Sequence, residues 1–290
     1  MMDFLTWCLS TPWALQPERL SAYAAVLVGR YARRAGADVE TPQPAAARVQ
    51  RAGAGRSGAI AVVPIYGTIV QRASQLGLCE GGTSTQAVSA ALQVANADET
   101  IDQILLDIDS PGGSVYGVSE LADEIRASKK PVTAVANSLA ASAAYWLGCS
   151  AREFYMTPGG EVGSIGVWMA HEDWSRAIAD AGVDVTLISA GKFKTEGNPY
   201  GPLGDEAKAF LQSRTDDYYG AFTRAVAKGR GVSVDQVRSG MGQGRVLGAA
   251  QAQAEGMVDG VKTFADVVKH MQRSTASSRA AAERRLQLLG

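Results

Sequence analysis

The sequence predicts an α/β fold in which helices flank a mostly parallel sheet. Short apolar runs alternate with helical patterns from residue 59 onward, which is typical of β-α-β units. Glycine-rich or polar segments follow two of the predicted strands, where open α/β sheets place their sites. The chain has 290 residues, of which 46% are hydrophobic and 20% charged, as is ordinary for a soluble globular protein.

Strands are predicted where a short apolar run is bounded by turn residues. The first is the buried run AIAVVPIYGTIV, which is followed by a turn. In chain order, the predicted strands are 59–70, 103–109, 132–136, 153–157, 164–170 and 184–189. Segment 257–261 then returns towards the sheet.

Helices are predicted from apolar residues at helical spacing, such as Val118, Leu121 and Ile125. The longest runs from about Asp205 to Lys228 and follows the polar loop AGKFKTEGNPYGPLG. In chain order, the predicted helices are 85–97, 117–128, 141–151, 172–182, 205–228, 232–240 and 247–256.

Composition along the chain predicts four parts. Residues 1–35 are expected to be a helical N-terminal arm, and residues 36–57, rich in Pro, Ala, Gly and Arg, a flexible linker. Residues 58–264 are expected to form the α/β domain, and residues 265–290 a helical, charged tail.

The first residues do not have the pattern of a signal peptide. Asp3 stands where a positive region would be, and Pro12 interrupts the apolar run. The apolar segment 20–34 is too short to span a bilayer and ends in basic residues, so it is interpreted as an amphipathic docking helix. We therefore expect a cytoplasmic protein with no membrane anchor.

The charge and the metal-ligating residues exclude several function classes. The formal net charge is −1, which does not suggest a nucleic-acid partner. The three cysteines, Cys8, Cys79 and Cys149, are too widely spaced for a disulfide framework or a metal motif. With only two histidines, a zinc site is not expected, and no metal or cofactor is predicted.

The motif DSPGGSV, residues 109–115, comes directly after a predicted buried strand. Pro111 sets a turn, and Gly112 and Gly113 allow backbone conformations that are closed to other residues. A Gly-Gly turn also exposes backbone N–H groups that can hold a developing oxyanion. On its own, the motif is explained better by an ordinary tight turn than by an oxyanion site.

The stretch AASAAYW, residues 140–146, places Ser142 among alanines. Small neighbours would let a substrate carbonyl approach the hydroxyl, so Ser142 is a candidate nucleophile. The alternative is a serine that hydrogen-bonds within a packed helix. The stretch alone does not decide between the two.

A serine nucleophile needs a proton acceptor, and neither His171 nor His270 is tied to the site by any pattern. A lysine can act as the base where burial lowers its pKa. Of the eight lysines, Lys192 and Lys194 lie in the loop SAGKFKTEGNPY after a predicted strand. The other six lie on predicted helices, at helix ends or in the tail.

Four motifs, DSPGGSV, AASAAYW, VGSIGV and SAGKFKTEGNPY, resemble the signal peptide peptidase A family of serine peptidases in order and spacing. The runs GSIGVWMAH and KTEGNPYGPL most resemble its phage branch, the head-maturation proteases of lambda-like phages. The resemblance covers roughly residues 58–262. It implies a Clp/crotonase-like fold and a Ser–Lys dyad.

The resemblance also implies residue roles. Ser142 resembles the nucleophile and Lys194 the general base, with Lys192 as the second candidate. Ser164 resembles the serine that positions the lysine.

The amides of Gly112 or Gly113, with that of Ala143, resemble the oxyanion hole. One departure is that many family members have glycines where Ala143 and Ala144 follow the serine, so this backbone has less freedom.

The phage branch implies a serine endopeptidase that cleaves scaffold, capsid or portal proteins, and possibly itself. It also implies a homo-oligomer with active sites near subunit contacts, acting in the host cytoplasm or in the prohead. Three alternatives are a non-catalytic capsid or scaffold component, a bacterial peptidase that degrades signal peptides, and an acyl-CoA enzyme of the crotonase type. The last gives no reason for combining Ser142 with Lys194.

Overall fold

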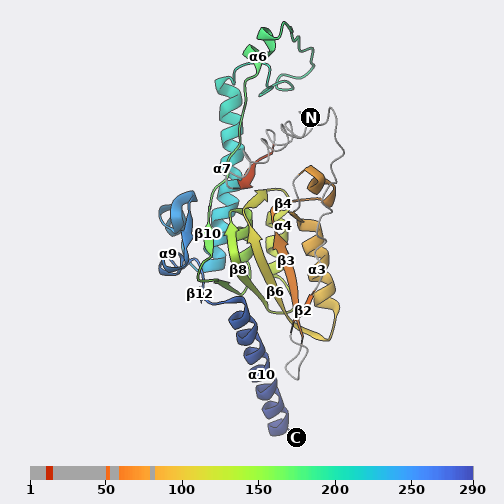
Figure 1. The fold of residues 1–290 in the computed structure, drawn as a ribbon, viewed down its shortest axis with the longest axis vertical. Helices are drawn as coiled ribbons and strands as arrows, with labels where there is room; N and C mark the ends of the chain where they lie inside the picture. The colour runs from red at the N-terminus through yellow and green to blue at the C-terminus, as the bar shows by residue number, and fades with distance from the viewer. Residues whose placement is uncertain (1–10, 16–49, 53–58, 79–81, 290) are drawn as a thin grey trace.

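The structure is a computed structural model and describes residues 11–15, 50–52, 59–78 and 82–289. Two sheets are formed within these residues. The larger runs in the order β11-β10-β8-β6-β3-β2, with β9 and β12 branching from β8, and the smaller in the order β1-β7-β4-β5. Figure 1 shows the larger sheet at the centre of the molecule, with helices on both sides.

The strands of the larger sheet are mostly parallel, which confirms the predicted α/β fold. Pairs β3–β6, β6–β8, β8–β9 and β8–β10 are all parallel, and antiparallel pairing is confined to β2–β3 and β10–β11. The strands are β2 (Gln50–Ala52), β3 (Ala59–Tyr66), β6 (Ile101–Ser110), β8 (Val132–Ala141), β9 (Glu153–Met156), β10 (Glu161–Gly163), β11 (Val246–Gly248) and β12 (Gly260–Val261).

The smaller sheet stands at the carboxyl ends of the central strands. It brings together β1 (Trp13–Leu15), β4 (Thr68–Val70), β5 (Gly82–Ser84) and β7 (Gly112–Ser114). Strand β7 is the Gly-Gly turn segment itself, and it pairs with β4 on one side and with β1 on the other.

Helices cover the two faces of the larger sheet unequally. One face packs against α3 (Thr85–Ala97), α4 (Val118–Arg126), α5 (Ala143–Gly148) and the C-terminal half of α7 (Asp205–Arg230) in the main hydrophobic core. The other face is covered by α10 (Phe264–Leu289), where Val267 and Met271 pack on Leu105 and Val135. The Gln103 amide also donates to the Met271 carbonyl, at 2.7 Å.

The remaining helices of the described residues are short. They are η1 (Ala73–Leu78), α6 (Ser175–Asp180), α8 (Val234–Ser239), η2 (Met241–Gly244) and α9 (Ala249–Ala254). Among the described residues, no helix is long and apolar enough to cross a membrane.

Several predicted elements differ from the structure. Residues 13–15, expected within a helical arm, form the buried strand β1, and residues 50–52, expected in a linker, form β2. The rest of the predicted arm and linker lies outside the described residues. The predicted tail is helical as expected, as part of α10.

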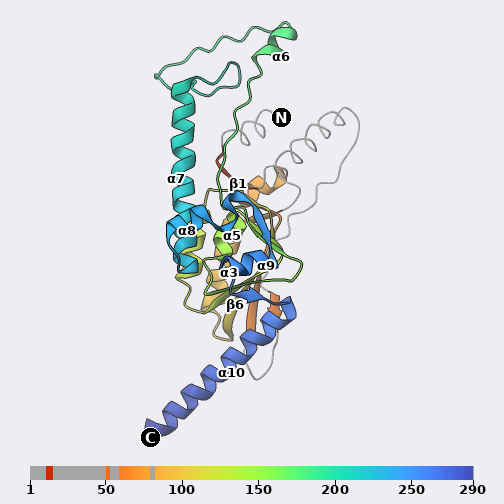
Figure 2. The same cartoon turned by 90° about the vertical axis from the view of Figure 1, so that its left-hand side faces the viewer.

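The predicted secondary structure differs most from the structure in segment 164–189. Of the two strands predicted there, 164–170 makes only an isolated bridge at Trp168, and 184–189 forms no strand. The helix predicted at 172–182 is limited to α6. Both views show that α6 and the chain leading from it to α7 project from the body, so residues 184–189 have no neighbouring strand to pair with (Figures 1 and 2).

Candidate active site

Ser142 lies at the junction between β8 and α5. Its φ and ψ are 56° and −119°, a conformation that residues other than glycine rarely adopt, and its side chain is 1% exposed. The Ser142 amide donates to the Gly163 carbonyl at 2.7 Å, and the Ser142 carbonyl accepts from the Trp146 amide at 3.0 Å. A serine held in a strained turn by bonds on both sides indicates a functional position.

The alanines around Ser142 make this turn possible. Ala140, Ala141, Ala143 and Ala144 are all fully buried, so larger side chains would have no room. The Ala143 amide is in the first turn of α5, where amides have no acceptor within the helix. It is therefore available as one of the predicted oxyanion donors.

Gly112 lies directly against Ser142. Its φ is 98°, and a Cβ added there would lie 2.9 Å from Ser142 Cβ and 2.9 Å from the Ala141 carbonyl oxygen. Its amide donates to Ser110 Oγ at 3.1 Å, and that hydroxyl donates to the Gly67 carbonyl at 2.6 Å. Gly112 must remain glycine, both for its φ and for this close approach.

The predicted segment VGSIGV passes along the other side of Ser142. Ser142 Oγ lies 3.4 Å from the Gly166 carbonyl oxygen, at the outer limit of a hydrogen bond. Ser164 is 9% exposed and has a φ of 53°, and its amide donates to the Arg245 carbonyl at 2.8 Å. The structure thus brings together Ser142, Gly112 and the segment that contains Ser164.

The two candidate lysines are not brought to Ser142. Lys192 Nζ lies 3.0 Å from Glu206 Oε1, in the first turn of α7, and its side chain is 71% exposed. Glu206 lies about 24 Å along the helix axis from Phe222. Phe222 stacks on Trp146 of α5, with ring centroids 4.8 Å apart. Lys194 lies in the same loop, beside Gly191. Figure 2 shows the α6 end of the molecule far from α5.

The two histidines are engaged elsewhere. His171 Nε2 lies 3.0 Å from the Asn198 carbonyl oxygen, within the projecting segment. His270, on α10, lies 3.1 Å from Glu153 Oε2 and 3.2 Å from Tyr155 Oη. Neither has a contact with Ser142, in agreement with the sequence argument against a histidine base.

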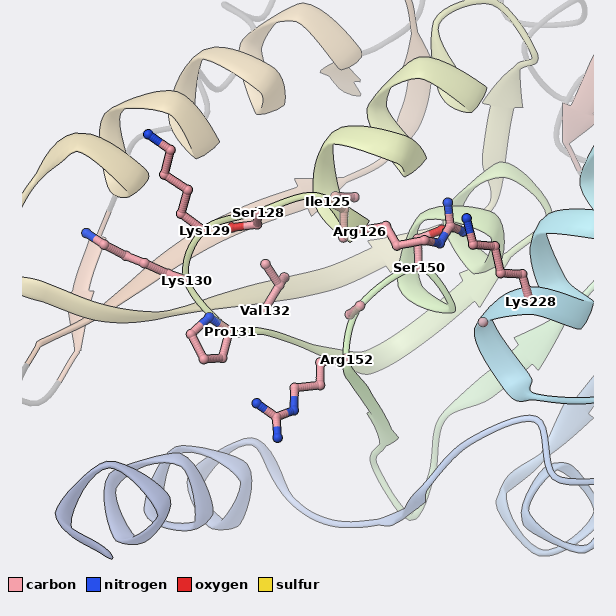
Figure 3. Close-up of a pocket in the computed structure, with 12 residues that line it drawn as sticks. Ile125, Arg126, Ser128, Lys129, Lys130, Pro131, Val132, Ser150, Arg152 and Lys228 are labelled. Atoms are coloured by element: carbon pink, nitrogen blue, oxygen red, sulfur yellow. The ribbon is translucent and has the colours of Figure 1, made fainter. Parts of the chain in front are cut away.

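A second serine and lysine line a cavity of about 510 Å³ between α4, α5 and the end of α7. Ser150 Oγ donates to the Trp146 carbonyl at 2.9 Å and accepts from Arg126 at 2.9 Å, so its only proton is already engaged. Figure 3 shows Lys228 beside Ser150 and Arg126, whereas Lys129, Lys130 and Arg152 point away in other directions. The cavity therefore contains neither a free nucleophile nor a focused cluster of charge.

Tyr66, which is 44% exposed, and the buried Asp107 form a polar pair towards the carboxyl ends of β3 and β6. Tyr66 Oη donates to Asp107 Oδ2. Burial raises the pKa of Asp107, while hydrogen bonds from Tyr66 and Asn137 oppose the rise. Burial and then the hydrogen bond to Asp107 raise the pKa of Tyr66.

Within the described residues, no three His, Cys, Asp or Glu side chains are grouped to hold a metal ion.

Sequence reasoning missed Trp13, Leu15 and Trp168. Strand β1 pairs with β7 beside Ser142, and the Trp168 indole donates to the Leu15 carbonyl at 2.8 Å. A three-residue strand is too short to produce a period in the sequence, so no pattern marked it.

The mostly parallel sheet flanked by helices defines an α/β protein, and the Clp protease model matches residues 65–162. The chain belongs to peptidase family S49, whose model matches residues 124–277. The family that the four motifs resemble is thus confirmed.

Three relatives illustrate the match. Capsid assembly protease C of Escherichia phage lambda is 37% identical over 73% of this chain and 48% of its own length. Head-tail preconnector protein GP5 of Enterobacteria phage P21 is 40% identical over 61% of this chain and 36% of its own. Protease 4 of Haemophilus influenzae is 26% identical over 74% of this chain and 34% of its own. The chain thus spans about half or less of the length of these relatives.

Proposed function

We propose that the chain is a serine endopeptidase and that Ser142 is its nucleophile. The observation that carries the proposal is the conformation of Ser142, which is strained, buried and placed against Gly112. Strain of this kind is retained where a site requires it. Membership of a peptidase family supports the same reaction class.

The proposed base is Lys194, with Lys192 as the second candidate. A neutral lysine takes the proton from Ser142 Oγ, and the oxygen attacks the carbonyl carbon of the peptide bond. The amides of Gly113 and Ala143 would stabilise the tetrahedral oxyanion, and that of Gly112 could do so only after releasing Ser110 Oγ. The lysine then protonates the leaving amine and activates the water that hydrolyses the acyl-enzyme. Ser164 is the proposed positioning residue for the lysine.

The lysine is proposed to come from a second copy of the chain. In the structure the loop that carries Lys194 is remote from Ser142, and the segment before it exposes Val183, Val185, Leu187 and Ile188, the last by 95%. Phe193 and Phe210 are also more than half exposed. An apolar surface of this kind is typical of a subunit contact. A homo-oligomer would cover it and could bring the loop to a neighbouring Ser142.

The proposed substrates are phage assembly proteins. The two phage relatives are a capsid assembly protease and a head-tail preconnector protein. We propose that this chain cleaves scaffold, capsid or portal proteins, and possibly itself, at the prohead in the host cytoplasm.

The proposal is tested by co-expressing the chain with its scaffold and capsid proteins and mapping the products by mass spectrometry. Ser142→Ala should abolish cleavage while circular dichroism stays unchanged, because the substitution removes one buried hydroxyl. Ser150→Ala is the matched control and should cleave normally. Retained cleavage by Ser142→Ala would refute the assignment, and full activity in Lys194→Ala would move the base to Lys192 or elsewhere.

A further inference from the structure

Strand β1 lies between β7 and Trp168, beside the proposed nucleophile. Trp13, Ala14 and Leu15 are each no more than 1% exposed, although they belong to a strand of only three residues. They run antiparallel to β7, with Trp13 opposite Ser114, Ala14 opposite Gly113 and Leu15 opposite Gly112.

The main chain of this segment is hydrogen-bonded on both edges. On one edge the Val115 amide donates to the Pro12 carbonyl at 3.2 Å. On the other, Trp13 and Trp168 exchange two backbone bonds, at 2.9 and 3.0 Å. The indole of Trp168 adds a bond to the Leu15 carbonyl. The groove between β7 and Trp168 is therefore built to hold an extended peptide by its backbone.

The segment also lies against the reactive part of the site. The point where a Cβ on Gly112 would sit is 2.2 Å from the Ala14 carbonyl oxygen and 2.9 Å from Ser142 Cβ. Along an antiparallel ladder, hydrogen-bonded residue pairs alternate with pairs that are not hydrogen-bonded. Because Pro12 and Val115 are a hydrogen-bonded pair, the next one along the ladder is Ala14 with Gly113. The Gly113 amide, one of the proposed oxyanion donors, therefore faces this segment.

We propose that residues 11–15 occupy the peptide-binding groove of the Ser142 site as a substrate-like strand, which an incoming substrate must displace. This inference rests on the proposed function. The main-chain bonds of β1 are ones that any extended peptide can make, so a substrate in the same register competes for them directly. The segment thus acts as an inhibitor carried by the chain itself.

The side chains of β1 indicate which peptides the groove accepts. Ala14 is fully buried, and its carbonyl lies against Gly112, so the groove takes a small side chain at this position. Trp13 and Leu15 are enclosed at the flanking positions, so the groove takes large apolar side chains there. The preferred ligand is an extended peptide with a small residue between two large apolar ones.

A reversible disulfide tests the inference. Trp13 and Ser114 form a non-bonded antiparallel pair, with a Cα separation of about 4.5 Å that a disulfide can bridge. The variant combines Trp13→Cys and Ser114→Cys with Ser142→Ala, Cys8→Ser and Cys79→Ser. Binding of a fluorescein-labelled peptide TPWAL is measured by anisotropy before and after reduction. A peptide TPWDL, with a charge at the enclosed small position, is the matched control.

The reduced protein should bind TPWAL at least about tenfold more tightly than the oxidised protein, because the oxidised strand cannot leave the groove. Neither form should bind TPWDL. Equal binding of TPWAL by the two forms, including no binding by either, would overturn the inference. Since the assay needs no chemistry, redox-dependent binding together with an inactive wild type would refute the proposed function and leave the groove assignment intact.

Discussion

Ser142 and Ser164 have positive φ angles, 56° and 53°, where the neighbouring strands β8 and β10 end. The Ser142 amide donates a hydrogen bond to the Gly163 carbonyl, and the Ser164 amide donates one to the Arg245 carbonyl. Two strained residues in adjacent turns store free energy that the surrounding parallel strands must offset. The site therefore depends on the rigidity of the sheet, and small backbone changes should affect it strongly.

Gly112→Ala should reduce both stability and activity. A Cβ there would meet the Ala14 carbonyl at 2.2 Å and would require an alanine at φ 98°, so we expect a loss of about 2 kcal/mol or more in the free energy of unfolding. Gly159→Ala is the matched control, since its Cβ would meet nothing within 4 Å, and it should change stability by less than about 0.5 kcal/mol. Urea denaturation and a peptide-cleavage assay measure the two effects. Equal behaviour of the two variants would contradict this account of Gly112.

Asp107 should make stability depend on pH. Burial raises its folded pKa above the usual value of 3.8, so as pH rises past that value the unfolded chain releases its proton before the folded one does. The stability that Asp107 adds to the folded state is therefore fully present below about pH 3.8. It falls as pH rises towards the folded pKa, and it stays lost above that pKa. Asp107→Asn cannot ionise, so it should gain stability relative to wild type as pH rises.

The measurement is urea denaturation of wild type and Asp107→Asn between about pH 3 and pH 7. Asp180→Asn is the control, because Asp180 is exposed at the end of α6 and is not among the groups that shift the pKa of Asp107. A stability difference between wild type and Asp107→Asn that does not change with pH would contradict the prediction.

Among the elements, α7 has two halves with different roles. Its C-terminal half is in the core, where Phe222 is fully buried and stacks on Trp146 with an angle of 9° between the rings. Its N-terminal half carries the exposed Phe210, and the loop that contains Lys194 comes directly before it in the chain. The helix thus connects the sheet to a projecting segment that is proposed to serve a neighbouring subunit.

Phe222→Ala and Phe210→Ala should separate these roles. Loss of the buried ring should lower the free energy of unfolding by about 3–5 kcal/mol. Loss of the exposed ring should change it by less than about 0.5 kcal/mol in the monomer but weaken self-association. Urea denaturation at low protein concentration and sedimentation velocity measure the two effects. Unchanged association in Phe210→Ala would argue against a contact at this surface.

Sequence patterns predicted the central strands and helices because their buried apolar residues recur at a regular spacing. The predicted strand 103–109 lies within β6, and the stripe of Val118, Leu121 and Ile125 faces the core. The predicted strand 184–189 is wrong because its apolar residues have no partner strand within the structure. Its apolar character is explained better by a surface that another chain would cover.

The sequence could predict only the part of the candidate site in which short motifs at the ends of neighbouring strands determine the backbone. Ser142 and Gly112 lie together because β6 and β8 are neighbouring parallel strands that end at the same edge. The place of Lys194 depends on a long loop, which sequence spacing cannot determine. Strand β1 is held by tertiary pairing alone, so its place beside Ser142 became visible only in the structure.

At the scale of the whole molecule, the described residues form an α/β body from which α6, the chain on either side of it and the first half of α7 project (Figures 1 and 2). The proposed nucleophile lies in the body, and the proposed base lies in the projecting part. This separation is the reason for proposing that a complete site needs two copies of the chain.

Subunit mixing tests this claim most directly. Ser142→Ala and Lys194→Ala should each be inactive alone, because each lacks one member of the dyad. When the two variants are dissociated, mixed and reassembled, cleavage of a peptide substrate should return, since Ser142 of one copy meets Lys194 of the other. Wild type treated in the same way sets the full activity. A mixture that stays inactive while wild type recovers would show that the two residues do not act across subunits.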